Sequence, residues 1–220
     1  MSSRVTARPL DQQASDAAYD RWAPIYDLIF DLPFHPGRLA AARAAGRAAP
    51  RGDILVVGVG TGLELGLLPA TSRVTGVDVS RPMLEVAHTR VFRKKLSQVK
   101  ALRQMDAGKL ELPDASFDVA LAPYVMSVLP DPARALDEMW RVVRPGGEMV
   151  VMNHFAAEKG WRVGVESAMD GAAAWLGWHP KFPFSAVGDW LAARTAARLI
   201  ERRELPPLRM FTLLRIGKDG

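Results

Sequence analysis

The segment 54–62, Ile-Leu-Val-Val-Gly-Val-Gly-Thr-Gly, constrains the fold more than any other part of this sequence. An apolar run of strand length leads into a loop with glycines at positions 58, 60 and 62, and residues 63–68 can then start a helix. Glycines at alternate positions let the backbone turn tightly and approach a ligand closely, because no Cβ stands in the way. The segment therefore predicts a buried strand followed by a ligand-binding turn.

A second strand with a well-placed carboxylate strengthens this interpretation. Residues 73–79 form a strand pattern with Asp78 near its end. In a doubly wound sheet such a carboxylate lies at the carboxyl edge, where it can accept both hydroxyls of a ribose. Ser80 is a good N-cap and Pro82 suits the first helical turn, so we expect the next helix to begin immediately. Further strands are expected at 98–105, where Asp106 and Ala107 follow, and at 116–122, and residues 144–151 are expected to form a turn into a fifth strand.

The spacing of the glycines separates two kinds of nucleotide-binding turn. The dinucleotide fingerprint G-x-G-x-x-G needs its third glycine at position 63, which is Leu63. The G-x-G-x-G found here resembles motif I of the class I S-adenosylmethionine (SAM) methyltransferases. This resemblance implies SAM as the cofactor and S-adenosylhomocysteine as its product. The cofactor-binding residues that it implies are Tyr26, Gly58, Gly60, Thr61, Gly62, Asp78, Val79, Met83, Asp106 and Ala107.

The residues that precede the first strand resemble a smaller group of methyltransferases. Residues 19–27, Tyr-Asp-Arg-Trp-Ala-Pro-Ile-Tyr-Asp, look like a segment of bacterial phospholipid N-methyltransferases of the ubiquinone-methyltransferase-like type, which methylate phosphatidylethanolamine. Residues 122–130 and 152–155 are also similar. The methylated headgroup amines that such enzymes produce are often cationic, and aromatic faces hold such cations well. We therefore assign Tyr19, Tyr26 and Tyr124 to the methyl-transfer pocket, and His154 as a base or a headgroup ligand.

One position departs from the family pattern. The family has an acid two residues before the first glycine of motif I, where it helps to hold the methionine ammonium of SAM, and this chain has Val56 there. Val56 keeps the strand apolar, and whether Glu64 compensates for the missing acid is left open by the sequence.

The expected architecture is α/β, a doubly wound and mostly parallel seven-stranded sheet with right-handed crossovers. Residues 197–205 and 211–218 resemble the antiparallel strand pair that closes this fold, and helices at 10–49 and 158–177 would form a lid. We predict one methyltransferase domain, since 220 residues suit a single core. Its expected parts are an N-terminal helical lid and membrane-contact segment (1–50), a SAM-binding core (51–155), an aromatic helical insertion (156–190) and closing strands (191–220).

The charge balance points to an anionic partner. The chain has 29 Lys and Arg against 24 Asp and Glu, and its pI is about 9.8. Amphipathic aromatic rings beside basic residues suit a membrane headgroup interface, although the same rings could instead cap the active site. The basic group on the Ala-rich helix comprises Arg38, Arg43 and Arg47, and the aromatic group comprises Trp161, Trp175, Trp178, Phe182, Phe184 and Trp190.

These observations predict a cytoplasmic protein that lies peripherally on the inner face of the membrane and takes a phospholipid substrate. Residues 1–6 carry no apolar stretch of the kind that directs export. The chain has no Cys and only four His without the H-E-x-x-H spacing, so no metal site is expected. No obligate protein partner is inferred.

Three alternatives stay open. A quinone-precursor or other small-molecule methyltransferase would share the core. A nucleic-acid methyltransferase would explain the basicity, but the N-P-P-Y type of signature is replaced by Ala-Pro-Tyr-Val at 122–125, so we expect no nucleic-acid partner. A SAM-binding protein with impaired turnover is the third alternative, and Val56 is its main support.

Overall fold

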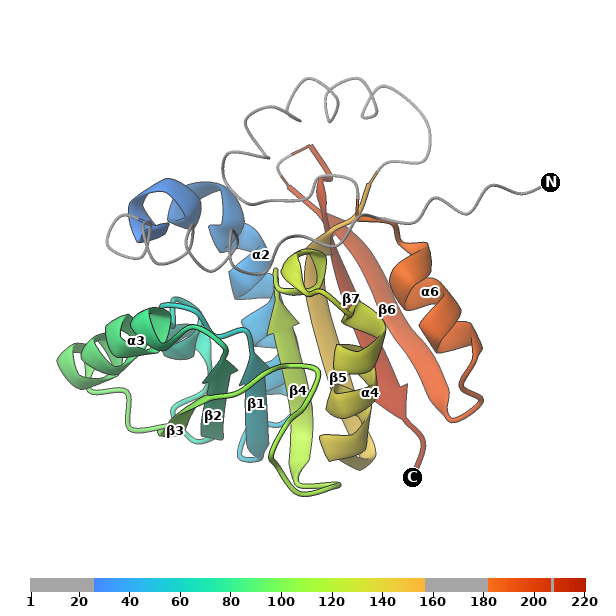
Figure 1. Ribbon diagram of the computed structural model, residues 1–220, viewed down its shortest axis with the longest axis horizontal. Helices are drawn as coiled ribbons and strands as arrows, with labels where there is room; N and C mark the ends of the chain where they lie inside the picture. Colours follow the sequence, from blue (N-terminus) through green and yellow to red (C-terminus); the bar gives the residue numbers. More distant parts are fainter. Residues whose placement is uncertain (1–25, 157–181, 207) are drawn as a thin grey trace.

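A computed structural model describes residues 26–156, 182–206 and 208–220, with side chains from residue 34 onward. A seven-stranded sheet forms the centre of the fold (Figure 1), with the strand order β3-β2-β1-β4-β5-β7-β6. The strands are β1 (Asp53–Val57), β2 (Arg73–Asp78), β3 (Val99–Gln104), β4 (Phe117–Pro123), β5 (Val143–His154), β6 (Ala197–Leu205) and β7 (Phe211–Lys218).

The pairing of the strands confirms the predicted architecture. Strands β1 to β5 pair in parallel, whereas β7 pairs antiparallel with both β5 and β6. The closing pair β6 and β7 has the bounds that the sequence predicts. Because β5 and β7 run in opposite directions, the end of one strand lies beside the start of the other, and His154 pairs with Phe211. This register brings two distant parts of the chain together at one edge of the sheet.

Helices cover both faces of the sheet, which accounts for the apolar character of its central strands. Helices α2 (Tyr26–Ala48) and α3 (Arg81–Lys94) pack on one face, and α4 (Pro132–Val142) and α6 (Ser185–Ala192) pack on the other (Figure 1). In β1, Ile54 and Val56 face the side of α2, while Leu55 and Val57 face the side of α4. A strand buried on both faces has to be apolar at every position, as in other parallel sheets.

Small side chains let α2 approach the sheet closely. Four alanines of this helix are completely buried and belong to the same apolar cluster as Val56. Its neighbour Arg38 is also buried, with only 6% of its surface exposed. The prediction that Arg38 belongs with Arg43 and Arg47 to one exposed basic group is therefore wrong for Arg38, whereas the other two are exposed. The alanines are Ala41, Ala42, Ala44 and Ala45.

Two local expectations also need correction. The segment after the glycine loop forms only a single 3₁₀ turn, η1 (Leu65–Leu67), because Pro69 follows and cannot supply the N–H that a continuing helix needs. Strand β5 starts at Val143, before the predicted turn, and an irregularity in its pairing with β4 accommodates residues 144–147.

The described aromatic residues near the C-terminus are part of the core. Trp190 is 6% exposed and donates a hydrogen bond from Nε1 to Asp137 at 2.8 Å. Phe182 is buried and Phe184 is partly buried, and both rings pack against Phe155. These three residues therefore cap the core instead of facing a membrane. Tyr19, Trp161, Trp175, Trp178 and the predicted helices before residue 26 and at 158–177 lie outside the described residues, and the predicted division into segments stays a prediction.

Candidate active site

The predicted site residues gather at one edge of the sheet because the five parallel strands end there. The glycine loop follows β1, Asp78 ends β2, Asp106 follows β3, Tyr124 follows β4 and His154 ends β5. In an open parallel sheet, this carboxyl edge is where ligands bind. The helical turn η2 (Met126–Val128) continues the loop after β4 on the same edge.

The three glycines of the loop have different roles. All three have positive φ values, which only glycine adopts without strain: +67° at Gly58, +51° at Gly60 and +75° at Gly62. A Cβ at Gly58 would lie 2.4 Å from a methyl carbon of Val125, and one at Gly62 would lie 2.7 Å from a methyl carbon of Leu65. A Cβ at Gly60 would meet no atom within 4 Å. Gly58 and Gly62 therefore permit close packing, while Gly60 faces open space that a ligand can fill.

Asp78 connects this loop to the second strand. Its Oδ2 accepts a hydrogen bond from the Gly60 N–H at 2.7 Å, and its Oδ1 accepts one from the Ser80 N–H at 2.9 Å. Burial raises the pKa of Asp78, and these backbone N–H groups oppose the rise. Each carboxylate oxygen still has a lone pair beyond the one it uses, so Asp78 retains the capacity to accept two ribose hydroxyls. The geometry thus fits the role expected of this residue.

Four more of the predicted cofactor-binding residues lie near Asp78. Val79 is 50% exposed, which is high for an apolar residue in this fold. The exposed Asp106 accepts a hydrogen bond from the Gly108 N–H through Oδ1 at 2.8 Å. Ala107 and Met83 are buried, so they can contribute to a cofactor site mainly through packing. The N-terminus of α3 is capped as predicted, because Ser80 Oγ accepts a hydrogen bond from the Met83 N–H.

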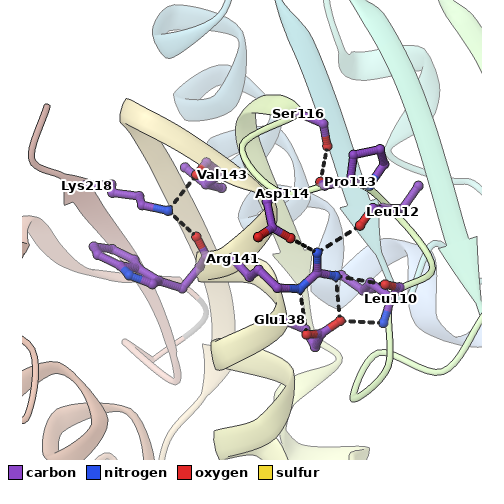
Figure 2. A network of polar contacts seen from close by, with 10 residues as sticks. Leu110, Leu112, Pro113, Asp114, Ser116, Glu138, Arg141, Val143 and Lys218 are labelled. Atoms are coloured by element: carbon purple, nitrogen blue, oxygen red, sulfur yellow. Dashed lines mark hydrogen bonds and ion pairs between the residues drawn. The ribbon is translucent and has the colours of Figure 1, made fainter.

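Arg141 on α4 fixes the loop that carries Asp106 and Ala107 (Figure 2). Its guanidinium donates to the Leu112 and Leu110 carbonyl oxygens at 2.9 and 2.8 Å. It also donates to both carboxylate oxygens of Glu138, one of which accepts the Leu110 N–H. Arg141 lowers the pKa of Glu138 through these hydrogen bonds. A residue that no sequence motif singles out therefore holds the loop after β3 against the core.

An aromatic group stands next to the glycine loop. The rings of Phe34, Tyr124 and Phe211 contact one another, with centroids 4.8 to 5.2 Å apart. Tyr124 has φ of +61°, and its hydroxyl donates a hydrogen bond to the Phe34 carbonyl oxygen at 2.9 Å. Such backbone strain in a bulky residue persists only where surrounding contacts impose it, and it is common at functional sites. The next residue, Val125, is the one that packs on Gly58.

Tyr124 cannot serve as a base near neutral pH. Burial is the main reason why its pKa lies well above the usual value, so the phenol stays neutral. In the described structure, Tyr124 therefore contributes an aromatic ring and a hydrogen-bond donor, and not a base. Of its predicted companions, Tyr19 lies outside the described residues, and Tyr26 is the first residue of α2, whose side chain is not described.

His154 is buried beside the rings of Phe34, Tyr124 and Phe211. It is 1% exposed, and its Nδ1 lies 2.7 Å from the Met210 carbonyl oxygen, to which it must donate. That hydrogen bond leaves the Nε2 atom with the lone pair in the neutral ring. Its ring lies edge-to-face against Phe211, and the Asn153 amide donates to the His154 carbonyl oxygen. The role of His154 as base or ligand stays a prediction.

Comparison with known proteins identifies the chemistry. A methyltransferase domain model matches residues 55–151. Phosphatidylethanolamine N-methyltransferase from Cereibacter sphaeroides is 41% identical over 210 residues, which make up 95% of this chain and 100% of that protein. The chain belongs to the SAM-dependent methyltransferases. Demethylmenaquinone methyltransferase from Deinococcus radiodurans is 35% identical over 147 residues, which cover 64% of this methyltransferase and 60% of the relative.

A solved structure has the same fold. The 1,6-didemethyltoxoflavin-N1-methyltransferase of Burkholderia thailandensis, with S-adenosylhomocysteine bound, superposes with a TM-score of 0.70 at 15% identity. The match covers 100% of this methyltransferase and 94% of that chain. At this identity the similarity concerns the fold alone. The open space at Gly60 and the free acceptor capacity of Asp78 are the local features that fit SAM.

Several residues of the site are missed by sequence reasoning. Phe34 and Phe211 carry no motif, and they reach Tyr124 only through the position of α2 and the register of β7. Val125 could be found only from the Cβ that Gly58 lacks. Asn153 lies in the segment 152–155 that resembles the family, and it is completely buried at the end of β5.

Proposed function

We propose that this methyltransferase transfers methyl groups from SAM to the headgroup amine of phosphatidylethanolamine and of its methylated products, towards phosphatidylcholine. The observation that carries the proposal is the 41% identity with a phosphatidylethanolamine N-methyltransferase along nearly the whole of both chains. The demethylmenaquinone methyltransferase matches less of the chain at lower identity, so a quinone-precursor substrate is the second candidate.

The chemistry of the site suits an amine acceptor. SAM supplies an activated methyl group, so the protein has to position a neutral amine close to it, and proximity provides much of the rate. The contacts of Tyr124 with Phe34 and Phe211 provide aromatic faces beside the glycine loop, and such faces attract methylated ammonium groups. Because Nδ1 of His154 donates to the Met210 carbonyl oxygen, Nε2 is the ring atom that would accept a proton if His154 acts as the base.

The activity test uses labelled SAM and a lipid substrate. The purified protein is incubated with vesicles that contain phosphatidylethanolamine, and the labelled lipids are separated by thin-layer chromatography. We expect label in methylated phosphatidylethanolamines, and a slower reaction in Tyr124→Ala and in His154→Gln at unchanged binding of S-adenosylhomocysteine. Label in quinone precursors and none in lipid would favour the second candidate.

We also propose that the protein acts as a peripheral protein at an anionic membrane surface, on the cytoplasmic inner face. The support is the net charge of +5, with Arg43 and Arg47 exposed one turn apart on α2. Leu199 and Ile200 on the edge strand β6 add exposed apolar surface. Among the described residues, no helix has both the length and the apolar character needed to cross a bilayer. We propose no nucleic-acid partner and no obligate protein partner.

Vesicle sedimentation tests the membrane proposal. The double variant Arg43→Glu/Arg47→Glu should bind vesicles with anionic lipid more weakly than the natural protein, while its affinity for S-adenosylhomocysteine stays unchanged. Lys94→Glu/Lys95→Glu, at the last residue and the C-cap of α3, makes the same change in net charge at another place and serves as the control. Binding that falls as salt rises supports electrostatic attachment. Equal binding to neutral and anionic vesicles would contradict the proposal.

A further inference from the structure

A buried carboxyl group stands directly after the glycine loop. Glu64 is 5% exposed, and its Oε1 is buried without a hydrogen-bond partner among the described residues. Leaving a buried polar atom unpaired is costly, and an uncompensated carboxylate costs more than a neutral group. Native proteins rarely keep such atoms unless a ligand, an ion or water completes them. The position of Glu64 therefore needs an explanation that its packing does not give.

The surroundings of Glu64 belong to the cofactor site. The residue lies two positions after Gly62, and its carbonyl oxygen accepts the Leu67 N–H at 2.9 Å in the η1 turn. The charged groups that act on its carboxyl come from three elements: Arg38 on α2, Asp78 on β2 and Arg90 on α3. Arg90 is held at the loop, because its Nε donates to the Thr61 carbonyl oxygen at 2.8 Å.

Burial and the neighbouring groups shift the pKa of the Glu64 carboxyl group. Burial raises the pKa of Glu64 to about 7, and the negative charge of Asp78 adds to the rise. A hydrogen bond with the backbone of Glu64 itself opposes the rise most, followed by the positive charges of Arg38 and Arg90. The group is therefore poised between its neutral and charged forms near neutral pH, and a bound cation would favour the charged form.

SAM offers a group of complementary chemistry. The ribose of its adenosine part can donate hydrogen bonds to Asp78. Its amino-acid part carries a carboxylate and an ammonium group, and the ammonium has three N–H donors. We propose that Glu64 binds the α-ammonium group of the amino-acid part of SAM and so positions the cofactor over Gly60. The buried guanidinium of Arg38, on the helix beside it, adds positive charge that suits the carboxylate of the same part. This inference rests on the use of SAM in the proposed function.

Calorimetry with three ligands tests the assignment. S-adenosylhomocysteine has the ammonium but no sulfonium, SAM has both, and 5′-methylthioadenosine has neither. In Glu64→Gln, the affinities for SAM and S-adenosylhomocysteine should fall together, on the order of 10- to 100-fold, because a charge-assisted hydrogen bond is lost. The affinity for 5′-methylthioadenosine should not change. Glu85→Gln, which removes an exposed carboxylate from α3, should bind all three ligands normally.

A second measurement needs no variant. Binding of S-adenosylhomocysteine near pH 7 should release protons from Glu64, and calorimetry in two buffers of different ionisation enthalpy measures this release. The proton release should be absent for 5′-methylthioadenosine and absent in Glu64→Gln. A purely structural role would leave no such signal, so this readout still decides the question if the variant does not fold.

Three results would overturn the inference. Unchanged affinity for S-adenosylhomocysteine in Glu64→Gln would show that the carboxylate does not contact the ligand. A loss confined to SAM would assign Glu64 to the sulfonium instead, and an equal loss for all three ligands would indicate a structural role. Failure of the proposed lipid activity is a separate outcome, because these binding measurements contain no lipid.

Discussion

Two glycines of the loop should respond very differently to the same substitution. An alanine at Gly58 or Gly60 must adopt a left-handed conformation, which costs roughly 1–2 kcal/mol. At Gly58 the added methyl would also collide with Val125 at 2.4 Å, and overpacking of this kind costs roughly 1–3 kcal/mol more. Gly58→Ala should therefore lose about 2–5 kcal/mol of the free energy of unfolding, and Gly60→Ala only about 1–2 kcal/mol.

Among the folded variants, Gly60→Ala should lose more affinity for the cofactor than Gly58→Ala, which is the opposite of their order in stability. The Cβ of Gly60→Ala would occupy the open space over the loop, so its affinity for S-adenosylhomocysteine should fall by at least about 10-fold. Urea unfolding gives the stabilities, and calorimetry on protein shown to be folded by circular dichroism gives the affinities. Normal binding by Gly60→Ala would refute the placement of the cofactor. Equal stability of the two variants would refute the packing role of Gly58.

Three further substitutions test the surroundings of the loop. Asp78→Ala should abolish detectable binding of SAM by calorimetry while the fold persists, and an unchanged affinity would remove its assignment to the ribose. Arg141→Ala should lower the free energy of unfolding by about 2 kcal/mol. The paired Glu138 has a lowered pKa, so this loss should be full above its ordinary pKa of 4.5 and should shrink as pH falls below it, which urea unfolding at several pH values measures. Val56→Glu should not tighten the binding of S-adenosylhomocysteine, because Glu64 already supplies the carboxylate, and a clear gain would mean that the ammonium site is incomplete in the natural protein.

The parts of the fold that depend on short-range pattern were predictable. An apolar run between Asp53 and the glycine loop has to be a buried strand, and Ser80 followed by a proline defines the start of α3 through its own cap. These features follow from propensities and caps that act within a few residues.

Features that depend on register could not be predicted in this way. The aromatic group needs Phe211 to lie beside His154, and only the antiparallel pairing of β5 and β7 places it there. The burial of Arg38 could not be predicted either, because one sequence does not show which turn of an Ala-rich helix is buried and which turns are exposed. Its burial depends on how α2 lies against the sheet. Sequence therefore predicted the edge that carries the candidate site and several of its residues, but not Phe34, Phe211 or the burial of Arg38.

The apolar residue at position 56 and the acid at position 64 belong to one arrangement. Val56 is completely buried in the cluster that includes the alanines of α2, where a carboxylate would have to be desolvated against apolar methyl groups. At position 64 the carboxyl group is equally buried, but Arg38 and Arg90 act on it from two helices. The loop thus offers electrostatic compensation that the interior of β1 lacks. Because the acid is Glu64 in the loop and not a residue of β1, this chain can keep α2 packed closely on the sheet and still offer a charged group to the cofactor.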